Sequence, residues 1–333
     1  MRILILGGTV FLSRRIAELA LDLGHDVTCL ARGTTSDPPA GAVFVQTDRD
    51  GPDPYANVAK DWDLVVEVSW QPRQVREALQ ALSARAAHWV YVSSCSVYAD
   101  NAVPGADETA TLLPAYGGAS PAPGESYGEA KVACEQLCTE IRQEAAGGRV
   151  LMVRPGLICG PGDGSDRFGY WPARLARGGE VLLPAIRDAA TQTIDVDDLA
   201  GWIISAAASG LSGVFNTVGP SISFGNLIDA AATQTGFDGT LRWTEPAWLT
   251  EHGVAYWAGP ESLPHWLPQG YDGFATRSGS AAVAEGLTLR PVQDTIARVL
   301  EDERRRGLTR ERKSGLTPTT EKQLLARRND VTP

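Results

Sequence analysis

The sequence contains little lysine, methionine or histidine. Only four of its 30 basic residues are lysines, and it has two methionines and four histidines. The histidines are scattered, at His25, His88, His252 and His265, without the close spacing of a zinc site. The five cysteines are odd in number and show no CxxC pair, which disfavours a disulfide framework or a metal cluster. We therefore expect no bound metal.

The chain also lacks an excess of positive charge and any long apolar run. Its formal net charge is −10, so no global basic field attracts nucleic acid or an anionic membrane surface. No apolar run approaches the roughly 18 residues of a membrane-spanning helix. The sequence opens directly on an apolar strand pattern without the features of a secretion signal. We expect a cytoplasmic protein that binds neither nucleic acid nor membrane.

Short apolar runs alternate with helical patterns through the first half of the chain. Strands are expected over residues 2–6, 27–31, 42–46, 64–68 and 88–92, and helices over 11–21 and 72–86. Such alternation predicts parallel βαβ units, whose ligands bind at the carboxyl ends of the strands. The sequence therefore predicts an α/β fold, with a Rossmann-type doubly wound parallel sheet and a smaller C-terminal substrate-binding lobe.

A glycine-rich turn joins the first strand to the first helix. Backbone N–H groups in such a turn, together with the helix N-terminus, bind the pyrophosphate of a dinucleotide. The pattern GxxGxxG begins at Gly7 but has Val10 and Ser13 where further glycines are usual, and a side chain at Val10 narrows the space. The residues expected to contact cofactor here are Gly7, Gly8, Thr9, Val10, Phe11 and Leu12.

The ends of the following strands supply the other candidate cofactor contacts. Arg32 stands where an NAD-preferring site has an acid, and an arginine suits the 2′-phosphate of NADP. This modestly favours NADP over NAD, although Arg32 could instead stack on the adenine or face solvent. Asp48 could accept a hydrogen bond from the adenine amino group, and we also expect cofactor contacts from Ser69 and Pro155.

A tyrosine and a lysine lie four residues apart on one predicted helix, at Tyr127 and Lys131. Residues at this spacing share a helix face, and a nearby ammonium would lower the pKa of the phenol toward working pH. The alternative is a packed tyrosine and a solvated lysine. Because arginine is the usual basic residue in this chain, the lysine favours acid–base function.

Motifs in matching order over about residues 1–220 resemble the extended short-chain dehydrogenase/reductases, the NAD-dependent epimerase/dehydratase family. These motifs are Gly7-Gly8-Thr9-x-Phe11-Leu12, Val92-Ser93-Ser94-x-Ser96-Val97-Tyr98, Tyr127-x-x-x-Lys131, Arg154-Pro155-Gly156-x-x-x-Gly160-Pro161-Gly162-Asp163, Ile194-Asp195-Val196-Asp197-Asp198-Leu199-Ala200 and Phe215-Asn216-Thr217-Val218-Gly219.

The resemblance implies a catalytic role for three residues: Tyr127 exchanges the proton, Lys131 lowers its pKa and holds the nicotinamide ribose, and Ser94 polarises the substrate. Ser93 is the less favoured serine. A hydroxyl at a strand end can indeed hydrogen-bond a substrate oxygen as charge develops on it. The resemblance therefore implies hydride transfer at a carbon that bears a hydroxyl or carbonyl group.

Several positions depart from relatives that act on nucleotide-sugars. Those enzymes usually have an asparagine where this chain has Leu157, and an arginine where it has the stretch 191–193. The Asp-Glu pair of 4,6-dehydratases is replaced by Cys95 and Ser96. A UDP- or dTDP-sugar substrate is therefore less expected, and 4,6-dehydration is not expected. The candidate substrate contacts are Cys95, Ser96, Arg167 and Tyr170, the last two with ordinary salt bridging and packing as alternatives.

The predicted Rossmann domain covers residues 1–160, with 190–218 returning to it. The substrate lobe takes 161–189 and 219–310, and a C-terminal arm with a short helix near 319–328 takes 311–333. The arm could pack on a partner subunit, as in a homodimer, or be disordered. The long loop over 100–126 resembles a lid.

We therefore expect an NAD(P)-dependent oxidoreductase acting on a small polar molecule. A sugar or nucleotide-sugar epimerase with the same three residues is the close alternative. A noncatalytic, RNA-associated protein is a third reading, because some plastid RNA-binding relatives share the opening Gly7-Gly8-Thr9-x-Phe11.

Overall fold

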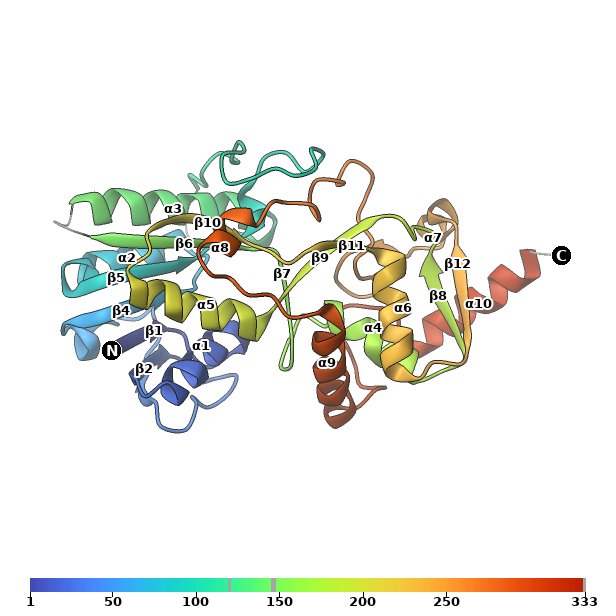
Figure 1. Ribbon diagram of the computed structural model, residues 1–333, viewed down its shortest axis with the longest axis horizontal. Coiled ribbons are helices and arrows are strands. Elements are labelled where there is room, and N and C mark those ends of the chain that lie inside the picture. Colours follow the sequence, from blue (N-terminus) through green and yellow to red (C-terminus); the bar gives the residue numbers. More distant parts are fainter. Residues whose placement is uncertain (119–120, 145–147, 332–333) are drawn as a thin grey trace. The chain divides into compact units, whose positions relative to one another are not determined.

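The computed structural model describes residues 1–118, 121–144 and 148–331. The chain forms two compact units (Figure 1). The first unit comprises Met1–Leu157, Val196–Gly219 and Arg277–Leu289, and the second comprises Ile158–Asp195, Pro220–Thr276 and Arg290–Pro333. Part of the loop that resembles a lid, at 119–120, falls outside the described residues.

The first unit is built on a seven-stranded parallel sheet with the strand order β10-β6-β5-β4-β1-β2-β3. From β1, the chain adds β2 and β3 on one side and then β4, β5, β6 and β10 on the other. The point between β1 and β4 is therefore the switch point, where doubly wound sheets bind ligands. This arrangement confirms the predicted Rossmann-type fold. The strands are β1 (Arg2–Leu6), β2 (Asp26–Ala31), β3 (Val43–Gln46), β4 (Trp62–Glu67), β5 (Ala86–Val92), β6 (Arg149–Pro155) and β10 (Gly213–Thr217).

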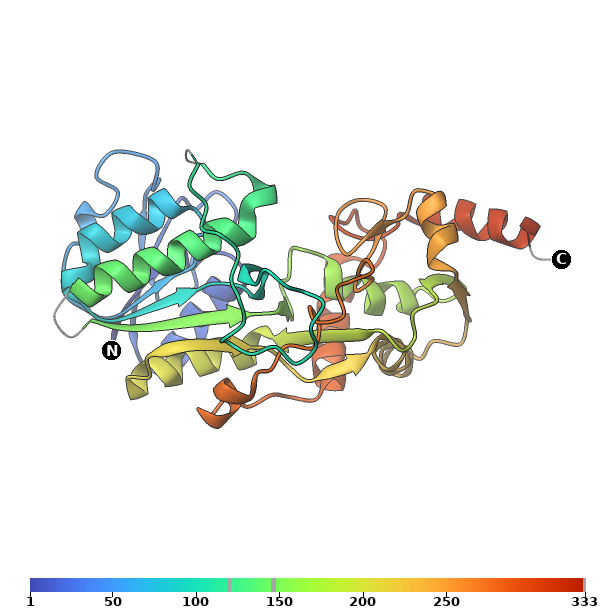
Figure 2. The same cartoon turned by 90° about the horizontal axis from the view of Figure 1, so that it is seen from above.

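Helices cover both faces of this sheet (Figures 1 and 2). α1 (Phe11–Asp22) packs with α5 (Val196–Ser209) on one face, and α2 (Pro72–Leu82) packs with α3 (Tyr127–Glu144) on the other. The short α8 (Ser280–Ala284) lies beside β10. Because both faces are covered, strand residues such as Ile3, Leu4 and Ile5 are fully buried.

The second unit combines small sheets with helices. Its strands are β7 (Leu157–Cys159), β9 (Ala190–Asp195) and β11 (Ser221–Ser223) in one sheet, and the pairs β8 (Glu180–Pro184) with β12 (Thr240–Thr244) and β13 (Ala255–Tyr256) with β14 (Ser262–Leu263). Its helices are α4 (Arg167–Ala176), α6 (Phe224–Thr235), α7 (Pro246–Glu251), α9 (Val292–Arg306) and α10 (Pro318–Val331). The core between α4, α6 and α9 contains Trp171 and Phe224, whose rings meet edge to face.

The boundaries of the two units and the C-terminal arm differ from the sequence-based expectation. Residues 158–160 and 190–195, predicted for the Rossmann domain, lie in the second unit. The predicted lobe includes residues 277–289, but this segment lies in the first unit, where Arg277 donates to the backbone carbonyl of Asp100 and to Asn101 Oδ1. The C-terminal arm is not loose within the described residues. Glu321 of α10 is buried, pairs with Arg174 at 2.5 Å and accepts the N–H of Leu182.

Among the described residues, no helix is long and apolar enough to cross a membrane, and no cluster of three metal-ligating side chains occurs. All five cysteines are buried thiols.

Candidate cofactor pocket and active site

The turn between β1 and α1 requires glycine because the backbone approaches β2 closely. Gly7 and Gly8 have φ values of +134° and +92°, which L side chains rarely adopt. A Cβ atom at Gly8 would overlap the sulfur of Cys29 in β2. Val10 precedes α1 as its N-cap and is 48% exposed. The turn therefore leaves its backbone and the Val10 side chain at the surface of the pocket described next.

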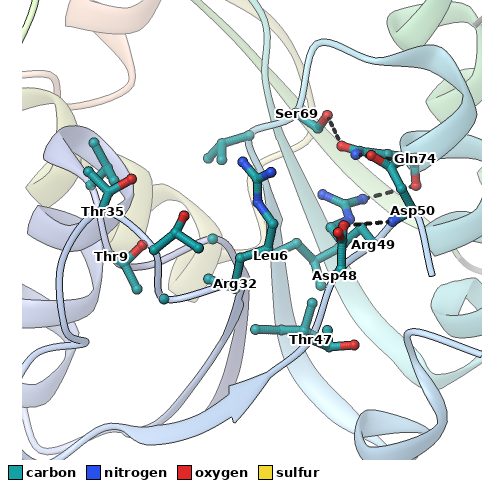
Figure 3. Close-up of a pocket in the computed structure, with 17 residues that line it drawn as sticks. Leu6, Thr9, Arg32, Thr35, Thr47, Asp48, Arg49, Asp50, Ser69 and Gln74 are labelled. Atoms are coloured by element: carbon teal, nitrogen blue, oxygen red, sulfur yellow. Dashed lines mark hydrogen bonds between the residues drawn. The ribbon is translucent and has the colours of Figure 1, made fainter. Parts of the chain in front are cut away.

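A pocket of about 310 Å³ opens beside this turn, in the first unit (Figure 3). Six of the predicted cofactor contacts line it, namely Gly7, Thr9, Val10, Arg32, Asp48 and Ser69. The other lining residues, which the sequence reasoning missed, are Leu6, Leu30, Ala31, Gly33, Thr34, Thr35, Thr47, Arg49, Asp50, Val68 and Gln74. The pocket thus lies at the carboxyl ends of β1, β2 and β4, and the segment that follows β3 forms one of its walls.

Arg32 extends into this pocket between Thr9 and Thr35 on one side and Asp48 on the other (Figure 3). The segment after it folds back on the glycine turn, because Ser36 donates to the Thr9 carbonyl and Arg14 donates to the Asp37 carbonyl at 2.6 Å. This brings the hydroxyl-bearing Thr34 and Thr35 to the pocket wall. The Thr-Thr pair shortly after Arg32 was the signal that could have identified them.

A buried ion pair fixes the opposite wall. The guanidinium of Arg49 binds Glu67 at the end of β4 through two contacts of 2.9 and 2.5 Å, and Glu67 is fully buried. The pair ties the segment after β3 to β4. Asp48 therefore stays at the rim, where its carboxylate accepts the N–H of Asp50 at 3.0 Å.

Lys131 lies near the start of α3 and is 2% exposed. Its ammonium donates to the carbonyl of Val92 at 2.6 Å, and to those of Ser69 and Val68 at 3.2 and 3.3 Å. Val92 is the last residue of β5, and Val68 and Ser69 follow β4. Burial lowers the pKa of Lys131 to about 8, so the group is still a cation at neutral pH. The nitrogen lies 6.0 Å from the centre of the Tyr127 ring.

Ser94 and Tyr127 are brought to the same edge of the sheet by a tight backbone contact. Ser94 caps a short 3-10 turn, Cys95–Val97, and its Oγ lies 3.1 Å from both the N–H and the Oγ of Ser96. Gly128, next to Tyr127, touches the Ser96 carbonyl so closely that a Cβ there would overlap it. Ser94 is partly exposed, whereas Ser93 is 2% exposed.

Trp70 is a neighbour of Tyr127 that the sequence reasoning missed. The two ring centres are 5.6 Å apart and the rings are tilted by 56°. Trp70 directly follows Ser69, whose carbonyl accepts from Lys131. The ends of β4 and β5, Lys131, Trp70 and Tyr127 therefore form one packed group.

Other predicted residues occupy different environments. Cys95 is 3% exposed and its thiol faces the Arg154 carbonyl at 3.2 Å, and Tyr170 is 1% exposed in the core of the second unit. Both side chains are buried, and the contact with substrate expected for them stays a prediction. Arg167, also in the second unit, lies over the Trp257 ring at 5.2 Å. Gly8, Phe11, Leu12 and Pro155 do not line the pocket.

Known proteins share both the sequence pattern and the fold of this chain. The model of the NAD dependent epimerase/dehydratase family matches residues 3–217, and no curated protein matches. Among solved structures, the UDP-glucose 4-epimerase of Thermus thermophilus in complex with NAD is 18% identical, with a TM-score of 0.66 over 91% of this chain and 99% of that one.

Two Bacillus cereus structures are similarly related. The UDP-glucuronic acid 4-epimerase in complex with NAD is 14% identical, with a TM-score of 0.67 over 92% of this chain and 99% of that one. The UDP-N-acetylglucosamine 4-epimerase is 18% identical, with a TM-score of 0.64 over 91% and 96%. At these identities the likeness shows the fold. Because the family model matches well over half of the sequence, the chain is an enzyme that belongs to the NAD dependent epimerase/dehydratase family.

Proposed function

We propose that the protein is an NAD(P)-dependent oxidoreductase that acts at a hydroxyl or carbonyl carbon of a small polar substrate. The observation that supports the proposal is the buried ammonium of Lys131, which lies 6.0 Å from the centre of the Tyr127 ring and binds the carbonyl at the end of β5. Ser94 follows that strand, and we propose that Tyr127, Lys131 and Ser94 act as one group. Ser69 connects Lys131 to the pocket of the glycine turn, because it lines the pocket and its carbonyl accepts from Lys131.

The pocket residues fit the adenosine half of a dinucleotide. Gly7, Thr9 and Val10 bring the glycine turn to the pocket wall, where its backbone can meet a pyrophosphate, and Asp48 offers a carboxylate at the rim. When bound, the nicotinamide cofactor supplies the hydride-transfer chemistry. The residues of the chain then bind and orient the molecules and move the proton.

Each member of the group has a distinct proposed role. Tyr127 takes the proton from the substrate hydroxyl, or returns it to the carbonyl oxygen, at its phenolic oxygen. The Lys131 cation favours the phenolate through its charge. Its hydrogen bonds to three carbonyls hold it in place, so we assign it an electrostatic role first. Ser94 donates its hydroxyl hydrogen to the substrate oxygen in place of Ser96.

We further propose a preference for NADP over NAD. The end of β2 has Arg32 in place of a carboxylate, and the hydroxyls of Thr34 and Thr35 lie on the same pocket wall. A guanidinium and hydroxyl groups are suitable partners for a 2′-phosphate. In this preference the protein would differ from the Thermus thermophilus UDP-glucose 4-epimerase and the Bacillus cereus UDP-glucuronic acid 4-epimerase, whose structures are complexes with NAD.

An epimerase is the second candidate, favoured by the family and by the names of these similar structures. Transient oxidation and reduction by a retained cofactor would use the same three residues. The departures at Leu157 and at 191–193 favour a substrate other than a nucleotide-sugar.

The two candidates are separated by following the cofactor. The purified protein is denatured and the released nucleotide measured, and then NADPH or NADH is supplied with a panel of small carbonyl compounds and UDP-sugars. An oxidoreductase consumes one NAD(P)H for each product molecule and releases the oxidised nucleotide. Conversion of a sugar without net NAD(P)H consumption would establish the epimerase instead, and binding of neither nucleotide would refute both.

A further inference from the structure

A second cavity, of about 440 Å³, lies within the second unit. One wall is α4 with the residue that follows it, where Tyr170, Arg174 and Arg177 share a face at i, i+4 and i+7 spacing. The opposite wall is the segment between α9 and α10. The complete lining is Tyr170, Arg174, Arg177, Pro260, Glu261, Leu308, Thr309, Arg310, Glu311, Arg312, Gly315, Leu316, Thr317 and Pro318.

The α4 wall carries Arg177, whose positive charge is only weakly paired with a carboxylate. Arg174 binds Glu321 Oε2 at 2.5 Å and the Gly178 carbonyl at 2.9 Å. Arg177 approaches the same carboxylate oxygen only to 3.7 Å, and its Nε has no hydrogen-bond partner among the residues that the structure describes. Burial and the neighbouring Arg174 lower the pKa of Arg177. An anion in the cavity would relieve this repulsion.

On the opposite wall, the guanidinium groups share their carboxylate partners. Arg310 and Arg312 share Asp166 and Glu303, which additionally lie 3.5 and 3.6 Å from Arg306. Within the described part of the chain, Nη1 of Arg312 makes no hydrogen bond. Arg306, which does not line the cavity, also pairs with Asp302 at 3.5 Å. Arg310 and Arg312 therefore depend on the two shared carboxylates of Asp166 and Glu303.

The cavity is not uniformly positive, and this restricts the type of ligand. Glu311 and Glu261 line it too. Glu311 is exposed, while Glu261 accepts from the Thr320 hydroxyl through Oε1 and has no donor to Oε2 among the described residues. A ligand that carries an anionic group and also hydroxyl groups would satisfy both the arginines and Glu261.

The walls of the cavity are held in place before any ligand binds. Gly315 has a φ of +116° and lies so close to the Tyr170 ring that a Cβ there would overlap it. The adjacent Ser314 donates to the Ser165 carbonyl at 2.9 Å. Such preorganisation reduces the entropy that binding must overcome.

We propose that this cavity binds a small phosphorylated polyol, with the phosphate at Arg177 and the arginines of the facing wall and a hydroxyl group at Glu261. The ligand would connect α4 to the segment before α10. The site is formed by the second unit alone, and the proposal does not depend on the proposed oxidoreductase activity.

The probes are glycerol 3-phosphate and inorganic phosphate, titrated into the full chain at constant ionic strength and followed by calorimetry and by the melting temperature. Arg177→Gln removes the poorly compensated cation. Thr309→Asp adds a carboxylate at an exposed lining position, where folding should be unaffected. Arg304→Gln, at an exposed arginine of α9, and Arg32→Gln, in the cofactor pocket, are the controls.

We expect glycerol 3-phosphate to bind saturably and to raise the melting temperature, since a ligand of the folded state stabilises it. Arg177→Gln and Thr309→Asp should each weaken binding at least about tenfold, as expected for a charged contact, while both controls stay within about twofold of the parent. If Arg177→Gln does not fold, Thr309→Asp decides alone.

The proposal is overturned if glycerol 3-phosphate shows no saturable binding beyond the change that chloride causes at the same ionic strength. It is also overturned if Thr309→Asp binds glycerol 3-phosphate as tightly as the parent does. Loss of binding in Arg32→Gln would assign the phosphate to the cofactor pocket instead. Equal affinities for glycerol 3-phosphate and inorganic phosphate would refute the contact between the polyol and Glu261.

Discussion

The ammonium nitrogen of Lys131 lies 2.6 Å from the carbonyl oxygen of Val92, the last residue of β5. With further hydrogen bonds to Val68 and Ser69, the same group ties the end of β5 to the segment after β4. Lys131 therefore has a structural role in addition to the electrostatic role proposed for it. Its burial gives this role a measurable pH dependence.

Replacing Lys131 by methionine should change how stability depends on pH. The folded-state pKa is lowered to about 8 from the ordinary 10.5 by burial. Between these two values the unfolded chain holds a proton that the folded chain has released, so the contribution of Lys131 to stability rises with pH. The slope is at most about 1.4 kcal/mol per pH unit.

The measurement is urea unfolding of the parent and Lys131→Met at pH 7, 8, 9 and 10. The free energy of unfolding of the parent should increase relative to that of the variant above pH 8. A constant difference over this range would show that burial does not lower the pKa of this lysine.

Arg32→Gln should weaken NADPH binding selectively. Loss of a charged hydrogen bond to the 2′-phosphate costs about 1.5–3 kcal/mol, or roughly 10- to 150-fold in affinity. NADH lacks this phosphate, so its affinity should change by less than about threefold. Fluorescence titration of both nucleotides checks this, with Arg304→Gln as the control. An equal loss for both nucleotides would instead indicate that Arg32 stacks on the adenine.

Arg49→Gln should strongly destabilise the first unit, because it leaves the buried carboxylate of Glu67 without its cation. Breaking a buried pair from one side costs about 3–5 kcal/mol. The double variant Arg49→Gln, Glu67→Gln should recover much of this loss. Arg85→Gln removes an exposed pair with Asp61 at 3.8 Å and should cost less than about 1 kcal/mol. Urea unfolding measures all four proteins, and a similar loss in both single arginine variants would contradict the assigned difference.

Gly315→Ala should destabilise the second unit, because the new methyl group meets the Tyr170 ring at a backbone φ of +116°. We expect a loss of about 1–3 kcal/mol in unfolding free energy. Gly164→Ala is the matched control in the same unit, since nothing lies within 4 Å of its Cβ position. Equal stability of the two alanine variants would show that the segment does not lie against α4.

The sheet of the first unit could be predicted from sequence because local patterns encode it. Apolar runs mark buried strands, and Gly7 and Gly8 mark the turn whose backbone conformation requires glycine. Pairings between distant residues could not be predicted in this way. Arg49 and Glu67 are 18 residues apart in sequence, and their contact depends on how the segment after β3 lies against β4.

The direction in which individual side chains point was the other property that could not be predicted from the sequence. Cys95 and Ser96 are adjacent in sequence, but the 3-10 turn buries the Cys95 thiol and leaves Ser96 partly exposed beside Ser94. Trp70 reads as an ordinary residue after a strand, and only the position of α3 brings it to Tyr127. The packing of α10 was missed because Glu321 and Arg174 are far apart in sequence.

The most direct test of the account is Tyr127→Phe, compared with the parent and with Tyr271→Phe, which alters a tyrosine that is 39% exposed in the second unit. On a substrate found by the panel, we predict that Tyr127→Phe lowers kcat about 10²- to 10⁴-fold, the usual contribution of a general acid–base group. NADPH affinity should stay within about threefold of the parent, and Tyr271→Phe should be as active as the parent. Parental turnover in Tyr127→Phe would contradict the account.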